Sequence, residues 1–200
     1  IKGFALVSSL ITFVLSAVLL FQFDFSSADK LQLGNKISWI KSINANYEIG
    51  IDGISLPLLV LSTFITVLAI IYSIEHLPEP KSPKGFLALI LVLETGMNGT
   101  FVALDLILFF VFFEIVLLPM YFMIGIWGDK TVRTVSGFKN QIETRLYASI
   151  KFFVFTLFGS AFMLLGFLGL YYRGNKTFSI PELIELCLLY TSDAADDANC

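Results

Sequence analysis

The chain has 200 residues, of which 56% are hydrophobic and only 14% are charged. A soluble domain carries roughly a quarter charged residues, so this composition indicates a protein that crosses a membrane several times. The formal net charge of -3 argues against nucleic-acid binding, which requires a basic surface. Two cysteines near the end of the chain and one histidine, His76, define neither a disulfide framework nor a metal site.

Five apolar segments are long enough to cross a hydrocarbon layer of about 30 Å as helices. We therefore expect an all-α polytopic membrane protein, part of a larger helix bundle. The expected spans cover residues 4–23, 55–73, 86–104, 106–127 and 147–172. The first span follows a lysine, as a signal peptide would, but it is too long for one and no small-residue cleavage site follows it.

The connection between the first two spans, residues 24–54, is polar, and we expect a loop there. Ser55 is the expected N-cap of the second helix, with Pro57 in its first turn. The next connection contains three prolines, which exclude a continuous helix. Asp105 alone marks the turn between the third and fourth spans, which predicts a tight helical hairpin.

The third span contains small residues from Thr95 to Thr100, which predict the close approach of a neighbouring helix. The density of Lys and Arg places the connections at 75–85 and 128–146 on the inner side of the membrane, in the cytoplasm or matrix. Residues 177–189 are expected to form an external loop that opens a short amphipathic helix.

Glu114 lies near the middle of the fourth span, and Pro119 follows five positions later. An ionisable group at the bilayer centre costs about 2.5–3.5 kcal/mol on insertion scales, and such groups mark ion or proton pathways. The alternative for Glu114 is a neutral carboxyl that is hydrogen-bonded to a neighbouring helix. Pro119 removes one backbone hydrogen bond, so we expect a kink that widens the space beside the carboxylate.

Glu94 in the third span and Lys151 in the fifth are two further candidates for proton translocation. At 1.5 Å per residue, Glu114 lies about 20 Å from the inner end of its span and Lys151 about 6 Å from the same surface. The depths argue against a direct ion pair and favour a relay role for Lys151, with snorkelling to the interface as the alternative. For Glu94 both a relay role in the same cavity and a hydrogen-bonded helix contact stay open.

Residues 112–122, FFEIVLLPMYF, resemble the signature helix of the antiporter-like subunit M (chain 4) of proton-pumping NADH:quinone oxidoreductase, respiratory complex I. The same family matches further motifs at residues 51–56, 104–106, 147–153 and 156–160. The resemblance covers about residues 1–186, a partial antiporter-like transmembrane domain. It implies an N-terminal fragment whose spans correspond to the second to sixth family helices. We interpret residues 187–200 as a non-native tail, with a genuine tail as the alternative.

By this resemblance, Glu114 corresponds to the family's essential carboxylate, which works with a lysine on the next, broken helix, beyond this chain. Lys151 corresponds to a lysine on the sixth family helix. The family pattern leaves the role of Glu94 open.

The resemblance further implies a subunit that couples electron transfer from NADH to quinone with proton pumping. It implies no catalytic centre and no cofactor on this chain, with NADH, flavin, iron–sulfur clusters and quinone on other subunits. The implied partners are the lipid bilayer and other membrane subunits of complex I. The implied location is an energy-transducing membrane, and the motifs favour a bacterial cell membrane over the mitochondrial inner membrane.

Two alternatives to this function stay open. The first is a subunit of a multi-subunit cation/proton antiporter, which shares the glutamate and the lysine but has no redox partner. The second is a membrane scaffold without a transport role. A scaffold would not explain why Glu114 is present in the fourth span despite the free-energy cost of placing it in the bilayer.

Overall fold

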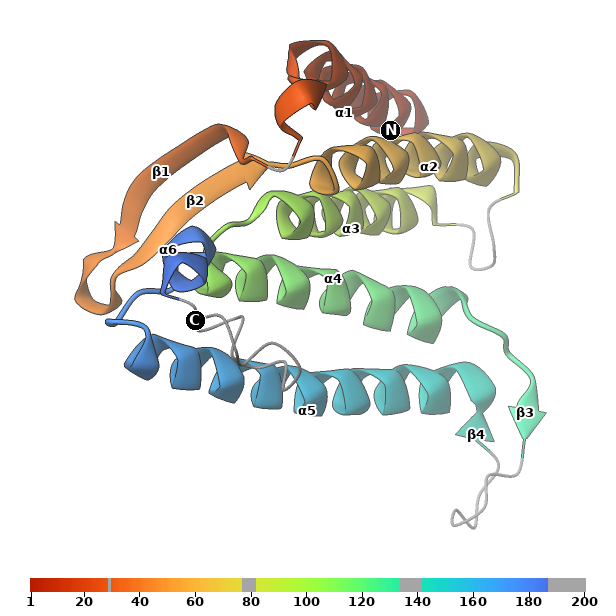
Figure 1. Ribbon diagram of the computed structural model, residues 1–200. Helices are drawn as coiled ribbons and strands as arrows, with labels where there is room; N and C mark the ends of the chain where they lie inside the picture. Colours follow the sequence, from red (N-terminus) through yellow and green to blue (C-terminus); the bar gives the residue numbers. More distant parts are fainter. Residues whose placement is uncertain (29, 77–81, 134–141, 187–200) are drawn as a thin grey trace.

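The computed structural model describes residues 1–28, 30–76, 82–133 and 142–186, and helices dominate it (Figure 1). Five helices in this part of the chain are long and apolar enough to span a membrane, which confirms the expected fold class. They are α1 (Lys2–Gln22), α2 (Ser55–Glu75), α3 (Pro83–Val102), α4 (Leu106–Trp127) and α5 (Thr144–Arg173). Consecutive helices lie side by side, so the connections alternate between the two ends of the bundle (Figure 1).

The connection between α1 and α2 is a β-hairpin, so the expectation of a loop at residues 24–54 was wrong. Strand β1 (Gln32–Ile40) pairs antiparallel with β2 (Ala45–Ile51). The short helix η1 (Phe25–Ser27) precedes the hairpin, and η2 (Lys41–Ile43) forms its tip together with Asn44, whose φ is 53°.

The sequence signal for this hairpin is weak because β1 is exposed along nearly its whole length. A strand with no buried face has no alternation of polar and apolar residues to reveal it.

Strand β2 is anchored to the turn between α3 and α4. The Leu104 N–H donates to the Glu48 carbonyl at 2.8 Å. A Cβ on Gly50 would lie 2.7 Å from Leu104 Cδ1, so a larger residue there would require the Leu104 side chain to shift. The hairpin therefore sits directly on the ends of α3 and α4.

Asp52, rather than Ser55, caps the start of α2. The Asp52 carboxylate accepts the N–H groups of Ile54 at 3.0 Å and Ser55 at 2.7 Å. The Ser55 hydroxyl in turn accepts the Asp52 N–H at 2.9 Å, which is the reciprocal arrangement of a capping box. Partial burial alone would raise the pKa of Asp52, but these hydrogen bonds together outweigh it and hold the pKa below its ordinary value.

The predicted close approach at the small residues of α3 is confirmed. A Cβ added to Gly96 would lie 2.7 Å from Val116 Cγ2, and one added to Gly99 would overlap the Phe112 ring. Both neighbours belong to α4. The glycines of α3 therefore face α4 and bring the two backbones together.

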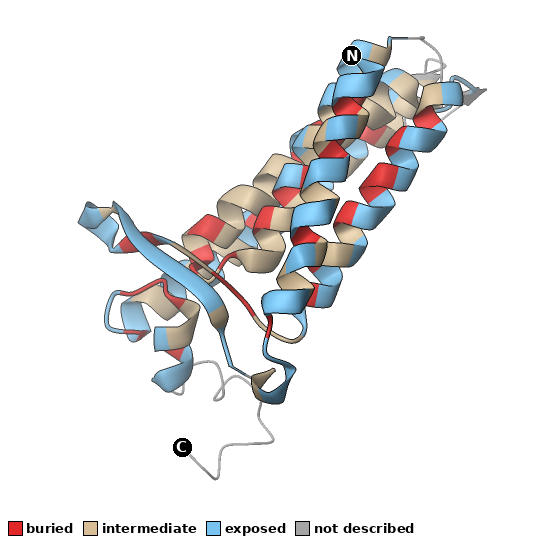
Figure 2. Ribbon diagram, turned by 90° about the horizontal axis from the view of Figure 1, so that it is seen from above, coloured by how far each residue is buried: buried red, intermediate tan, exposed pale blue. Residues whose placement is uncertain are grey.

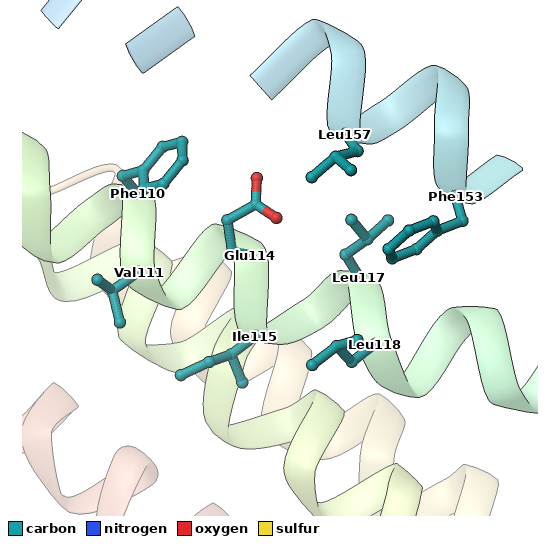
Figure 3. Close-up of a pocket in the computed structure, with 8 residues that line it drawn as sticks. All are labelled: Phe110, Val111, Glu114, Ile115, Leu117, Leu118, Phe153 and Leu157. Carbon is teal, nitrogen blue, oxygen red and sulfur yellow. The ribbon is translucent and has the colours of Figure 1, made fainter. Parts of the chain in front are cut away.

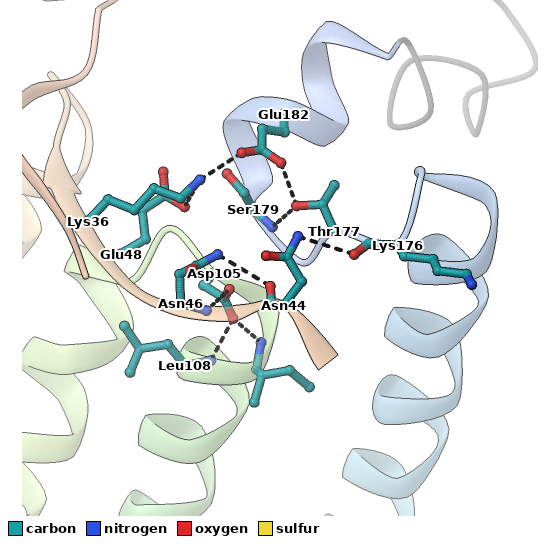
Figure 4. Close-up of polar contacts among 11 residues, drawn as sticks. Lys36, Asn44, Asn46, Glu48, Asp105, Leu108, Lys176, Thr177, Ser179 and Glu182 are labelled. Carbon is teal, nitrogen blue, oxygen red and sulfur yellow. Dashed lines mark hydrogen bonds and ion pairs between the residues drawn. The ribbon is translucent and has the colours of Figure 1, made fainter. Parts of the chain in front are cut away.

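The predicted short helix after α5 is α6 (Ile180–Glu185). Its Leu183 packs with Phe178, Ala45 and Leu106 in one buried cluster that joins α6 to β2 and α4. We call the hairpin, the α3–α4 turn and the segment 176–186 the outer cap (Figure 4).

The connection between α4 and α5 lies at the opposite end of the bundle (Figure 1). It contains the short strands β3 (Val132–Arg133) and β4 (Ile142–Glu143), which pair antiparallel. The tail at 187–200, the centre of this connection and much of the proline-rich connection lie outside the described residues. The assignment of this end to the inner side of the membrane stays a prediction.

Candidate functional site

Asp105 fixes the start of α4, the helix that carries Glu114. Its Oδ1 accepts the N–H groups of Ile107 at 2.9 Å and Leu108 at 3.2 Å, as an N-cap does. Its Oδ2 accepts the Asn46 N–H of β2 at 2.8 Å, and the residue is fully buried. One side chain therefore ties the outer cap to α4, and Glu114 follows about two and a half turns later.

The Glu114 side chain points into a pocket of about 330 Å³ between α4 and α5 (Figure 3). The other lining residues are all apolar: Phe110, Val111, Ile115, Leu117, Leu118, Phe153 and Leu157. Glu114 Oε1 is buried and has no hydrogen-bond partner among the described residues. A carboxylate oxygen in such a place is costly until it is protonated, hydrated or paired, so the pocket is suited to receive a proton or a cation.

The packing of α4 on α5 fixes the level of Lys151. The Tyr121 and Phe153 rings lie 5.2 Å apart, and Gly125 lies beside Ser149 one turn further along. Because the helices are antiparallel, Lys151 lies level with Met123. It is therefore about 13 Å along the helix axis from Glu114.

The Lys151 side chain is exposed, and its Nζ lies 5.6 Å from the centre of the Tyr147 ring. A cation over an aromatic face is a favourable contact, and Tyr147 is one turn nearer to the start of α5. The structure thus places Lys151 away from Glu114 and toward the end of the bundle where α4 connects to α5.

Helix α5 presents small polar residues to this contact that sequence reasoning did not single out. Ser149 and Ser160 are buried, and Thr156 and Ser160 line a second pocket together with Phe113 of α4. The spacing of seven and then four residues from Ser149 to Thr156 to Ser160 is that of one helix face. This periodicity is the signal that could have revealed them.

The hydroxyls of these three residues donate to carbonyls of the preceding turn, those of Leu146, Phe152 and Leu157, at 2.8–3.0 Å. Their oxygen lone pairs stay available, because each hydroxyl can accept as well as donate. The polar face of α5 therefore runs from beside Gly125 to the level of Glu114.

Glu94 does not line the Glu114 pocket. It is 4% exposed, and its Oε1 has no hydrogen-bond partner among the described residues. Because Gly96 and Gly99 face α4, Glu94 lies on the opposite side of α3. The structure thus separates the two glutamates that the sequence had suggested could share one cavity.

Pro119 is buried inside α4, which continues through it to Trp127. Proline has no N–H, so it donates no hydrogen bond to the carbonyl of Ile115, which lines the Glu114 pocket. The expected kink stays a prediction. His76 is exposed, and its ring stacks on Tyr72 with 4.6 Å between centroids.

Two family models match nearly the whole chain. Residues 3–100 match the family described as NADH-ubiquinone oxidoreductase chain 4, amino terminus. Residues 103–196 match the transmembrane family described as NADH:quinone oxidoreductase/Mrp antiporter.

Curated relatives agree with these matches. The chain is 42% identical to NADH-ubiquinone oxidoreductase chain 4 of Mycosarcoma maydis, over 94% of this chain and 35% of that protein. It is 36% identical to F(420)H(2) dehydrogenase subunit M of Methanosarcina mazei, over 91% of this chain and 34% of that protein. The chain therefore spans about a third of the length of these relatives.

Two solved structures share this fold. A chain of respiratory complex I from Thermus thermophilus superimposes with a TM-score of 0.72 at 23% identity, covering 92% of this chain and 35% of that one. A chain of the membrane-bound sulfane sulfur reductase, an archaeal respiratory membrane complex, gives 0.66 at 20% identity, covering 96% and 26%.

Proposed function

This chain belongs to the family of NADH-ubiquinone oxidoreductase chain 4 and NADH-quinone oxidoreductase subunit M proteins, and we propose that it forms part of a proton path through the membrane. The proton path would belong to a complex that couples electron transfer from NADH to quinone with proton pumping. The observation that carries the proposal is the buried Oε1 of Glu114, which has no partner in the described part of the chain and lies in an apolar pocket at mid-span.

Glu114 acts in this path by holding and releasing a proton. A cation brought near a carboxyl favours its ionised form, so the movement of a cation toward or away from the site would drive the release and uptake of the proton. We infer that this cation is a lysine on the helix that follows in the longer family members. On the α5 side, the described residues that line the pocket are apolar, so a lysine from another helix could approach Glu114 without competing with a cation of α5.

Lys151 serves as a relay nearer to the inner mouth. Its exposed ammonium lies about two and a half turns from the level of Glu114. The hydroxyls of Thr156 and Ser160 provide polar contacts along the α4–α5 contact between these levels, and Ser149 lies beside Gly125, just beyond Lys151. Water bound by these oxygens would connect Lys151 to Glu114. The other membrane subunits of the complex would pack against the remaining helix faces.

The test is Glu114→Gln in the complete complex, in its native energy-transducing membrane. Gln keeps the size of the side chain but cannot exchange a proton. We expect proton pumping and coupled NADH oxidation to fall by at least about tenfold while the complex stays assembled. Glu75→Gln, at the exposed end of α2, is the control and should pump normally. Normal pumping by an assembled Glu114→Gln complex would refute the proposal.

A second candidate is a subunit of a multi-subunit cation/proton antiporter, because the matched family description names both kinds of protein. It would use the same Glu114 site with an imposed ion gradient instead of electron transfer. The two are separated by measuring proton movement in membranes supplied with NADH and quinone, and then in membranes supplied only with a sodium gradient. Movement driven by NADH oxidation supports the first candidate.

A further inference from the structure

A second polar site lies on the far side of α3, within the contact of α1, α2 and α3. These helices meet in a buried apolar cluster formed by Ala5, Ile70, Leu87 and Ile90. The cluster sets a common level from which positions on the three helices can be counted. Figure 2 shows buried residues recurring at intervals along the helices.

One turn from this cluster, toward the outer cap, each helix places a buried polar residue. Ser9, Thr66 and Glu94 are each four residues, about 6 Å, from Ala5, Ile70 and Ile90 respectively. Four residues keep a side chain on the same helix face. Their exposed fractions are 0%, 4% and 4%, so all three side chains are buried at about the same level of the bundle, which we call the three-helix polar layer.

The next turn is polar as well. Ser62 and Asn98 are each eight residues, about 12 Å, from Ile70 and Ile90. Ser62 Oγ and Asn98 Oδ1 are buried without a partner among the described residues. Beside them, the buried Ser16 and Thr63 hydroxyls join α1 to α2 at 2.8 Å.

The three-helix polar layer contains acceptors but lacks a donor. Ser9 donates its hydroxyl proton to the Leu6 carbonyl at 3.1 Å, and Thr66 donates to the Ser62 carbonyl at 3.0 Å. Both hydroxyls therefore offer only lone pairs, and Glu94 Oε1 is itself unpaired. An ionised Glu94 would add a charge to a layer of acceptors, whereas a protonated one would supply the missing O–H.

The charged groups on the neighbouring helices lie too far from Glu94 to compensate a negative charge there. The charged side chains of α1 and α2 are Lys2 and Glu75, at the ends of their helices, and Lys2 donates to the Ile74 carbonyl at 2.8 Å. On α4 the charged group is Glu114, whose pocket lies toward α5. None of these groups supplies a cation to the level of Glu94.

We propose that Glu94 is a proton-binding carboxyl, held as a neutral acid whose O–H donates to a hydroxyl oxygen of the three-helix polar layer. This site is distinct from the Glu114 pocket, because the glycine contact between α3 and α4 separates them. The proposal does not depend on the proton path argued above. The bound species is a proton, and a sodium ion held by the same oxygens is the rival that the experiment must exclude.

The test is infrared spectroscopy of the complete complex carrying isotope-labelled glutamate, at neutral pH. The carbonyl band of a protonated carboxyl is distinct from the bands of a carboxylate. Subtracting the spectrum of Glu94→Gln from that of the wild type should leave a protonated-carboxyl band. The glutamine side chain has the same size and can itself donate, so the variant should fold. Glu75→Gln is the matched control and should remove carboxylate bands instead.

Two further measurements identify the hydrogen-bond acceptor of Glu94 and distinguish a bound proton from a bound sodium ion. Thr66→Val and Ser9→Ala each remove one acceptor, and at least one should move the Glu94 band toward that of a free acid. Loss of carboxylate bands in Glu94→Gln would overturn the proposal, and so would a protonated band that disappears on adding sodium ions. A band unmoved by both hydroxyl variants would place the acceptor outside the three-helix polar layer and would equally refute it.

Discussion

Asp105 is a buried carboxylate with three backbone donors, two from α4 and one from β2. A buried acceptor of this kind is stabilising only while its partners are present. If it is removed, each N–H left in the interior costs about 1–3 kcal/mol. Asp105 differs in this respect from Glu114, whose Oε1 is buried without a hydrogen-bond partner among the described residues.

We expect Asp105→Ala to lower the stability of the complex by at least about 2 kcal/mol, because the Asn46, Ile107 and Leu108 N–H groups lose their acceptor. The measurement is the thermal unfolding of the detergent-solubilised complex, with assembly followed on native gels. Asp24→Ala is the matched control, since Asp24 caps η1 but is exposed. Equal losses in the two variants would show that burial of Asp105 adds nothing.

At the scale of elements, the contact between α3 and α4 depends on the missing side chains of two glycines. Gly96 and Gly99 face Val116 and Phe112, which fill the space that a Cβ would need. In a membrane the hydrophobic effect does not drive helices together, so such close packing is a main source of their association. The contact also holds α4 at a fixed rotation, which directs Glu114 toward α5.

Gly99→Ala should loosen this contact and destabilise the complex by about 1–3 kcal/mol, because the new Cβ overlaps the Phe112 ring. Thermal inactivation of coupled activity is the readout. Gly166→Ala on α5 is the control: no described atom lies within 4 Å of the added Cβ, and alanine favours the helix by up to about 1 kcal/mol.

A second substitution tests the steric explanation of the Gly99 effect. Phe112→Leu removes the ring and should restore part of the stability when combined with Gly99→Ala. If the double variant is no more stable than Gly99→Ala alone, the overlap with Phe112 is not the cause.

At the scale of the whole molecule, the sequence predicts the helices well because each span must satisfy its own backbone hydrogen bonds inside a bilayer. The hairpin is different: its strands are held by Leu104 and Asp105, which follow it by dozens of residues. Such contacts leave no local periodic signal. Asp105 was recognised as a turn residue, yet its bond to Asn46 depends on the tertiary fold.

In the candidate site, too, some residues can be recognised from the sequence and others only from the tertiary structure. Glu114 and Lys151 stand out in the sequence because charges are rare in apolar segments. Ser149 and Ser160 do not, since serine occurs in spans for packing as well as for polarity. The separation of Glu94 from Glu114 could not be predicted either, because it depends on which face of α3 meets α4.

The outer cap joins segments that are far apart in the chain through two ion pairs of Lys36 (Figure 4). Lys36 of β1 lies 2.7 Å from Glu182 of α6 and 3.3 Å from Glu48 of β2. Hydrogen bonds from Lys36 and Thr177 lower the pKa of Glu182 below its ordinary value of 4.5. Burial alone would lower the pKa of Lys36, but its bonds to the two glutamates outweigh it and raise the pKa above 10.5.

These shifts predict how the docking of α6 on the hairpin depends on pH. The contribution of Glu182 is complete above pH 4.5 and is lost as the pH falls through its lower folded-state pKa. That of Lys36 is complete below pH 10.5 and is lost only as the pH rises through its higher folded-state pKa. Between these limits the docking of α6 should be insensitive to pH.

Hydrogen exchange of the α6 backbone, corrected for the pH dependence of intrinsic exchange, measures this docking. We expect protection to fall as the pH is lowered from about 6 to about 3. In Glu182→Gln protection should already be low at the higher pH and should change little, because the partner of Lys36 has lost its charge. Glu185→Gln on the same helix leaves the Lys36 pair intact and should behave as the wild type. A wild-type step that persists in Glu182→Gln would assign the pH response to another group.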